Sequence, residues 1–169
     1  RRYLEFSGYQ VEHVQNFTDI DDKIIKRAQE NGISTEELSK KYIADYFTDM
    51  NAINVLIAHH YPRATGEIPR IIESIEALIE KDKAYLSHAD VYFRVGIAPS
   101  YGKLSRRTRE GLLVGARVEA NRGKDDPLDF ALWKGAKPGE PSWSSPWGPG
   151  RPGWHIECTA MSLAYLGDT

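Results

Sequence analysis

The stretch Gly150–Ser162 reads GRPGWHIECTAMS and joins a turn to the start of a helix. Its Pro152-Gly153 pair predicts a sharp turn, and the apolar run behind that pair predicts a helix. A tryptophan, a histidine, a glutamate and the only cysteine of the chain fall within residues 154–158. Such a group at a helix start is typical of a substrate or metal site, so the interpretation of the whole chain begins here.

The overall composition is that of an ordinary globular domain. The chain has 169 residues, of which 41% are hydrophobic and 27% are charged, and its formal net charge is −2. This balance gives no global basic field of the kind that attracts nucleic acid, although it is compatible with a local basic patch. No apolar run reaches the roughly 18 residues of a membrane span, and the N-terminus has no signal-peptide pattern.

Cys158 is the single cysteine, which excludes an internal disulfide and fits a reducing compartment. It also excludes a zinc site of four cysteines, or of two cysteines and two histidines, built from this chain alone. A lone cysteine is most often a small buried hydrophobe. In the first turn of a helix, however, the helix dipole lowers the pKa of a thiol and favours the thiolate that binds zinc. Glu157 and His155 each fit either a helix cap or a ligand.

The hydrophobic pattern predicts a mixed α/β chain. Short strands are predicted at 11–17, 91–95 and 130–133, from their β-branched and aromatic residues. Helices are predicted from Ile20 to Gly32, behind a capping box at Ser34–Glu37, and from Pro69 to about Lys83. Residues 96–127 have poor periodicity and indicate an insertion. Residues 135–153 hold five prolines and five glycines and predict an ordered loop without regular structure.

Two charged segments have a functional and a simpler interpretation. Asp19, Asp21 and Asp22 suggest a metal site after a strand, where open α/β sheets bind ligands. An acidic helix start that caps the following helix is the commoner explanation and is favoured here. The basic stretch from Arg106 to Lys124 has residues able to contact phosphates, but its interspersed acidic residues favour a solvated loop.

Both ends of the sequence predict an internal fragment of a longer protein. Arg1–Phe6 has helix-forming residues with no capping residue before it, and the chain has no initiator methionine. Ser162–Leu166 predicts a helix that ends at Gly167, two residues before the chain stops.

Five blocks of the sequence, taken in order, resemble cysteinyl-tRNA synthetase. They are Val14–Ile25, Tyr61–Thr65, Tyr101–Ser105, Asp129–Lys134 and Gly150–Ser162. The likeness covers essentially the whole chain, and five blocks in the family's order make it specific. One departure is Thr65-Gly66-Glu67, which stands where the family commonly shows Glu-His.

The resemblance implies part of a Rossmann-type catalytic domain of a class I synthetase. Residues 1–83 and 151–169 would belong to the catalytic core, and residues 84–150 to an inserted connective region. The implied enzyme is a cytoplasmic, monomeric ligase without a membrane contact. It would activate cysteine with ATP and transfer it to tRNA(Cys). The family's Zn²⁺ binds the substrate thiolate, and because a hydroxyl is a far weaker ligand, the site rejects serine.

By the same resemblance, Cys158 is one zinc ligand, Trp154 lies beside the bound cysteine, and Thr18 lines the same pocket. His155 lies near them without an assigned role. No catalytic and no ATP-binding residue is implied within the chain. The family's HIGH-type motif and first zinc cysteine are expected before Arg1, and its His-His-Glu-Asn-Glu block and KMSKS loop after Thr169. One thiolate cannot complete a tetrahedral site, so the isolated chain is expected neither to form adenylate nor to bind zinc tightly.

Two alternatives remain open. The related ligase that joins cysteine to an amino-sugar inositol in mycothiol synthesis uses similar blocks without tRNA. The other alternative is a non-catalytic fragment that binds RNA or a partner, in which case the basic stretch would have to carry the affinity.

Overall fold

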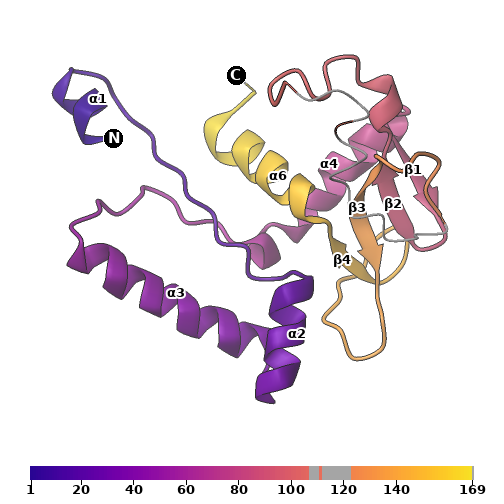
Figure 1. Cartoon of the computed structure of the whole chain (residues 1–169), viewed down its shortest axis with the longest axis horizontal. Coiled ribbons are helices and arrows are strands. Elements are labelled where there is room, and N and C mark those ends of the chain that lie inside the picture. Colours follow the sequence, from indigo (N-terminus) through magenta and orange to yellow (C-terminus); the bar gives the residue numbers. More distant parts are fainter. Residues whose placement is uncertain (107–110, 112–122, 169) are drawn as a thin grey trace. The chain divides into compact units, whose positions relative to one another are not determined.

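The computed structural model describes residues 1–106, 111 and 123–168 (Figure 1). It contains two compact units, one formed by Arg1–Arg70 with Glu157–Thr169 and the other by Ile71–Ile156. Two helices cross the boundary in sequence, α4 (Ile68–Glu80) and α6 (Trp154–Leu166). The boundaries of these two units differ from those of the predicted insertion at 84–150. The insertion therefore stays a prediction.

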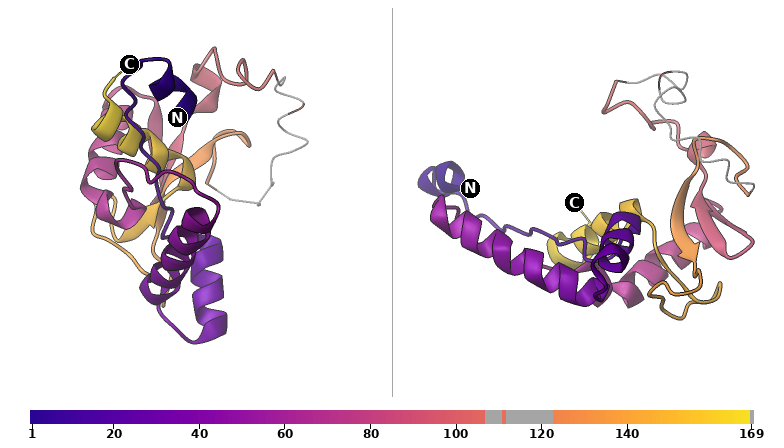
Figure 2. Two further views of the ribbon diagram at one scale, coloured as in Figure 1. Left: turned by 90° about the vertical axis from the view of Figure 1, so that its left-hand side faces the viewer. Right: turned by 60° about the horizontal axis from the view of Figure 1, so that its bottom comes forward.

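The first unit is mainly helical. It contains α1 (Arg2–Phe6), α2 (Asp22–Asn31), α3 (Thr35–Ala52) and a short 3₁₀ helix, η1 (Ala64–Gly66). Helix α2 lies against one end of the longer α3, as both views in Figure 2 show. Buried Ile25 and Ala28 come from α2, and buried Leu38 comes from α3. The apolar face of α2 is therefore buried, whereas α3 buries Leu38 and leaves Tyr42 exposed.

The predicted caps explain where α2 and α3 begin. Of the three candidate aspartates, Asp21 is the N-cap of α2, because its carboxylate accepts bonds from the N–H groups of Lys23 and Ile24 at 2.8 and 2.9 Å. Gly32 ends the helix with a φ of 64°, in the left-handed region that suits glycine. The capping box of Ser34 and Glu37 is confirmed, with both reciprocal bonds present.

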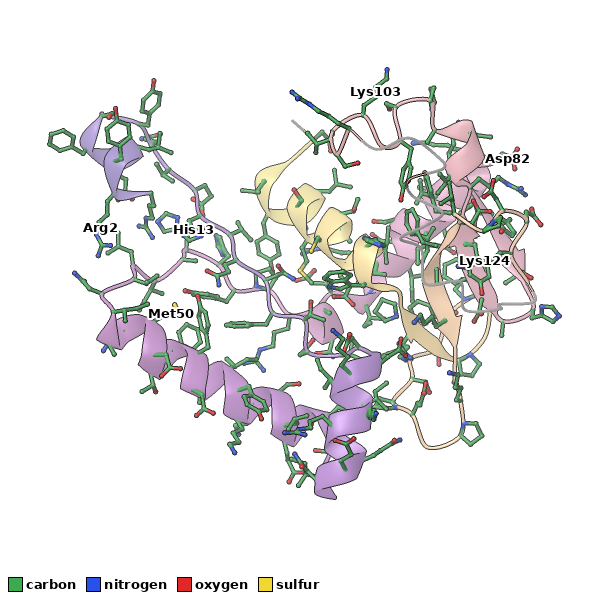
Figure 3. The ribbon with its side chains drawn as sticks, viewed as in Figure 1. Arg2, His13, Met50, Asp82, Lys103 and Lys124 are labelled. Atoms are coloured by element: carbon green, nitrogen blue, oxygen red, sulfur yellow. The ribbon has the colours of Figure 1, made fainter. Side chains whose placement is uncertain are left out.

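Two extended segments run parallel to each other through the first unit. Val14 pairs with His60 and Phe17 with Arg63, and the N–H groups of Gln15 and Phe17 donate to the carbonyls of His60 and Pro62. His13, labelled in Figure 3, lies on the first of these segments. The predicted strand at 11–17 is thus an extended segment held by isolated bridges, and α2 and α3 connect it to its parallel partner.

The second unit contains a four-stranded antiparallel sheet. Its strands are β1 (Ala84–Ser87), β2 (Asp90–Phe93), β3 (Phe130–Gly135) and β4 (Gly150–Pro152), in the order β1-β2-β3-β4. A short 3₁₀ helix, η2 (Val95–Ile97), follows β2. The expected Rossmann-type parallel sheet is not what these strands form. Only two residues separate β1 from β2, and so short a connection forces the strands to pair antiparallel.

Strand β4 corrects the expectation of an irregular loop over 135–153. It pairs with β3, and Trp133 lies opposite Pro152. The pairing depends on Gly150, because a Cβ at this position would overlap Nε1 of Trp133 and the carbonyl oxygen of Lys134. Trp133 is completely buried and its ring contacts Trp147 at 6.0 Å, so the proline-rich segment is packed on the sheet rather than a disordered linker.

A buried carboxylate joins the two sides of the segment 96–127. Asp129, only 3% exposed, accepts bonds from the N–H of Val95 and the hydroxyl of Tyr85, both at 2.8 Å. Most of the basic stretch Arg106–Lys124, namely residues 107–110 and 112–122, lies outside the described residues. The prediction that this stretch is a solvated loop therefore stays a prediction. No helix in the described ranges has the length and apolar character needed to cross a membrane.

Candidate functional site

The residues around Thr18 point alternately to two sides of their extended segment. Gln15 donates to the hydroxyl of Tyr46 at 2.6 Å, and the Phe17 ring stacks on Tyr61 at 5.4 Å. Phe17 also meets the edges of Tyr46 and Phe47, so the odd-numbered residues 15 and 17 face an aromatic cluster that includes residues of α3. The even-numbered residues 16 and 18 contact α6, as the two-residue period of extended backbone requires.

Two contacts join this segment to α6. The hydroxyl of Thr18 donates to Oε2 of Glu157 at 3.2 Å. The side chain of Asn16 lies against the thiol of Cys158, the residue after Glu157, and lowers its pKa. Glu157 is completely buried, whereas Cys158 is exposed. Two consecutive residues of α6, Glu157 and Cys158, therefore contact two alternate residues of the extended segment, Thr18 and Asn16.

The protonation of Cys158 differs from the sequence-based expectation. Partial covering of the thiol, and then the carboxylate charge of Glu157, raise its pKa, and the bond from Asn16 opposes them. Cys158 is the fifth residue of α6 rather than a member of its first turn. The helix dipole acts mainly on the first turn, so the predicted lowering of the thiol pKa is wrong for the free protein.

Trp154 and His155 open the same helix. The Trp154 side chain is 65% exposed and lies one helical turn before Cys158, a spacing that puts two residues on one helix face. The ring of His155 contacts Phe130 edge-on at 4.8 Å and Trp154 at 5.6 Å. The structure thus packs the His155 ring against two aromatic rings, whereas the sequence pattern left this residue open as a helix cap or a ligand.

The donor groups present fit only part of a metal site. No group of three or more His, Cys, Asp or Glu side chains able to hold an ion occurs in the described part of the chain. Cys158 offers one soft donor, and a zinc site needs four ligands in all. The chain's described residues therefore do not by themselves make a zinc centre.

The acidic segment is accounted for without a metal. Asp21 caps α2, and Asp19 is 7% exposed and accepts two bonds from Thr65, at 2.9 Å from its N–H and 2.6 Å from its hydroxyl. Thr65 belongs to η1, so Asp19 fixes the start of this turn to the extended segment. The interpretation of these carboxylates as structural is supported.

A pocket of about 600 Å³ between α2 and α3 borders the extended segment that contains Thr18. It has a mostly apolar and aromatic lining with Lys23 and Arg27 among it, and both Phe17 and Thr18 contribute to its wall. Thr18 thus lies between this hollow and the Glu157 carboxylate.

Sequence reasoning identified Thr18 and Cys158 but not Asn16, and it left Glu157 as a cap or a ligand. The signal for Asn16 was its spacing, since it stands two residues before Thr18 and so shares its face. Nothing in the local pattern predicts that Glu157 is buried, because that depends on the segment packed against it.

Comparisons with known proteins agree across the entire chain. The sequence pattern of the family described as tRNA synthetases class I (C) catalytic domain matches residues 1–169. The chain is 60% identical over 167 residues to a cysteine–tRNA ligase of Desulfitobacterium hafniense, covering 99% of this chain and 35% of that protein. Similar proteins from Carboxydothermus hydrogenoformans and Symbiobacterium thermophilum are 60% and 58% identical over 168 and 172 residues, covering 99% and 100% of this chain. The chain spans 36% of the length of each of these two relatives, about a third as in the first.

Proposed function

The chain belongs to the family of class I (C) tRNA synthetase catalytic domains, and from this premise we propose that it is part of a cysteine–tRNA ligase. The complete protein would join cysteine to ATP, giving cysteinyl-adenylate, and pass the cysteinyl group to tRNA(Cys). Relatives with this name match almost the whole chain at 55–60% identity, which supports the assignment. A cytoplasmic monomer is proposed with it.

The observation that carries the proposal is the meeting of residues 16–18 with the first turns of α6. The Thr18 hydroxyl bonds the Glu157 carboxylate, and Cys158 is the next residue of the same helix. In our proposal, Thr18 and Trp154 bind the substrate cysteine and Cys158 is one ligand of a zinc ion. The other zinc ligands, and the groups that bind ATP, would come from parts of the complete protein outside these residues.

The zinc ion, when bound, would supply a soft Lewis acid that prefers a thiolate to a hydroxyl. The chain's own contribution is to fix the donor in place. Asn16 lies beside the Cys158 thiol, and the bond from Thr18 to Glu157 anchors α6 there. The raised pKa of the free thiol implies that metal binding has to displace a proton from Cys158.

The finer fold assignment is also a proposal. The parallel pairing of 14–17 with 60–63, with α2 and α3 between them in sequence, is the connection expected in a Rossmann-type core. We propose that residues 1–83 and 151–169 belong to such a core. The antiparallel sheet of the second unit fits the connective region at 84–150, which would be inserted into it.

The test uses the complete protein that contains this chain. We expect cysteine-dependent exchange of pyrophosphate into ATP, cysteinylation of tRNA(Cys), and about one bound zinc ion per protein. Cys158→Ala should lose zinc and activity, while Ser162→Ala, at an exposed position of the same helix, should keep both.

Two results would overturn the proposal. Cysteine activation that proceeds to an amino-sugar inositol and never to tRNA would favour the mycothiol ligase. Binding of RNA without cysteine activation would favour a non-catalytic role.

A further inference from the structure

We propose that Glu157 is a positioning residue that makes Thr18 a hydrogen-bond acceptor for the ammonium group of the substrate amino acid. This inference rests on the proposed function and adds a residue with a defined task. Its starting point is that Glu157 is completely buried and receives a bond from the Thr18 hydroxyl.

A fully buried carboxylate is costly and needs compensating partners. Glu157 is one residue before Cys158 and could be replaced by an apolar residue if α6 required only packing at this position. The chain instead places a carboxylate against Thr18, 139 residues away in sequence. Burial of a charged group against a hydroxyl that borders a concave surface indicates that the arrangement serves that hydroxyl.

The direction of the hydrogen bond determines what Thr18 can do for a ligand. A threonine hydroxyl has one proton to donate and two lone pairs to accept with, whereas an ionised carboxylate only accepts. With its proton directed to Oε2 of Glu157, Thr18 offers only lone pairs to the other side. Lone pairs match an ammonium group, which only donates, and they do not match a carboxylate, which only accepts.

The extended segment keeps Thr18 in this orientation. Phe17 is held between Tyr46, Phe47 and Tyr61, so the segment cannot rotate about its axis without breaking these ring contacts. Thr18 is therefore fixed from its backbone by Phe17 and from its side chain by Glu157. A small substrate gains from such preorganisation because no side chain has to be ordered on binding.

The test compares ligands with and without the ammonium group in the complete ligase. Glu157→Met removes the acceptor at similar size, and Glu157→Gln keeps a neutral acceptor. We expect KM for cysteine to rise roughly tenfold in Glu157→Met and less in Glu157→Gln. The rise should not be larger, because the 3.2 Å bond from Thr18 to Glu157 is long for a hydroxyl donor and therefore weak. KM for ATP should stay within about twofold and kcat should change little, as for loss of uniform binding.

Inhibition by β-mercaptopropionate separates positioning from a general loss of structure. This molecule keeps the thiol and carboxylate of cysteine and lacks the ammonium group. Its inhibition constant should be the same in wild type and Glu157→Met. Thr18→Val, which keeps the shape without the hydroxyl, should weaken cysteine binding as much, and the double variant no further. Glu76→Gln, on an exposed part of α4, is the matched control.

Two outcomes would overturn the inference. Equal weakening of cysteine and β-mercaptopropionate would show that Glu157 only supports the fold of the site. Additive effects of Glu157→Met and Thr18→Val would show that the two residues act separately. A wild-type protein that activates no cysteine at all would instead overturn the proposed function, so the two failures are distinguishable.

Discussion

The hydroxyl of Tyr85 donates a 2.8 Å hydrogen bond to Oδ2 of Asp129, a buried carboxylate 44 residues further along the chain. The same hydroxyl accepts a bond from the N–H of Asp125 at 2.7 Å, and the Arg94 guanidinium lies 4.4 Å over the Tyr85 ring. Tyr85 is on β1, and Asp125 and Asp129 precede β3. The hydroxyl of Tyr85 thus joins the two ends of the segment 96–127, which the sequence predicts to be an insertion.

Removing this phenol should destabilise the second unit in a pH-dependent way. Burial, and then the bond to Asp129, raise the pKa of Tyr85 from 10.0 to about 12, while the bond from Asp125 opposes them. Because the folded state holds the proton more tightly, the stabilisation is complete below pH 10 and is lost as the pH rises to about 12. Tyr85→Phe should cost about 1–2 kcal/mol in the free energy of unfolding at neutral pH.

Urea unfolding of wild type and Tyr85→Phe at several pH values checks this prediction. The difference between the two proteins should be constant at neutral pH and shrink above pH 10. The chain has nine tyrosines, so the difference between the ultraviolet pH titrations of the two proteins isolates Tyr85. A Tyr85 that ionises like a free phenol would contradict the proposed network.

Asp19 should matter for stability far more than its neighbour Asp22. Asp19 is buried and accepts two bonds from Thr65, while Asp22 is exposed at the start of α2. Asp19→Ala leaves the half-buried hydroxyl and N–H of Thr65 without this acceptor, which should cost about 3 kcal/mol. Asp22→Ala removes an exposed carboxylate that interacts favourably with the helix dipole, which should cost about 0.5 kcal/mol.

Denaturant unfolding of both variants measures the difference, with Mg²⁺ added in a parallel series. Equal losses in the two variants, or a gain in wild-type stability on adding Mg²⁺ that Asp19→Ala abolishes, would revive the interpretation of this segment as a metal site.

Gly153 should tolerate no side chain. A Cβ at this position would overlap the carbonyl oxygen of Ala131, whose neighbour Leu132 accepts the Gly153 N–H at 2.8 Å. Gly153→Ala must push β3 away from the start of α6, at a cost of about 3 kcal/mol. Gly96→Ala is the control, since a Cβ there meets nothing within 4 Å. Thermal unfolding compares them, and similar melting temperatures for the two variants would refute the argument.

Features that depend on neighbours in sequence could be predicted from the chain. The Asp21 cap, the Ser34–Glu37 capping box and the apolar faces of α2 and α4 all involve residues three or four apart. Strand β4 was missed because its three residues carry no pattern of their own and are ordered by β3. Strand β1 was missed for the same reason, since it pairs with β2 across a two-residue turn.

The candidate site divides in the same way. Thr18 and Cys158 came from a resemblance to known sequences, and the fold brings their neighbourhoods together through Glu157 and Asn16. The burial of Glu157 and the raised pKa of Cys158 are properties of the packed structure. They could not be read from the helix start alone, where the dipole argument gave the opposite direction for the thiol.

The odd–even alternation of residues 15–18 limits how this chain can evolve. Inserting or deleting one residue directly after Val14 would turn Phe17 toward α6 and send Asn16 and Thr18 into the aromatic cluster. Two inserted residues would restore the faces but displace Thr18 by about 6.6 Å along the segment. Substitutions can therefore be tolerated in this segment during evolution. Insertions and deletions have to occur elsewhere, in surface loops whose residues do not alternate between two packed faces.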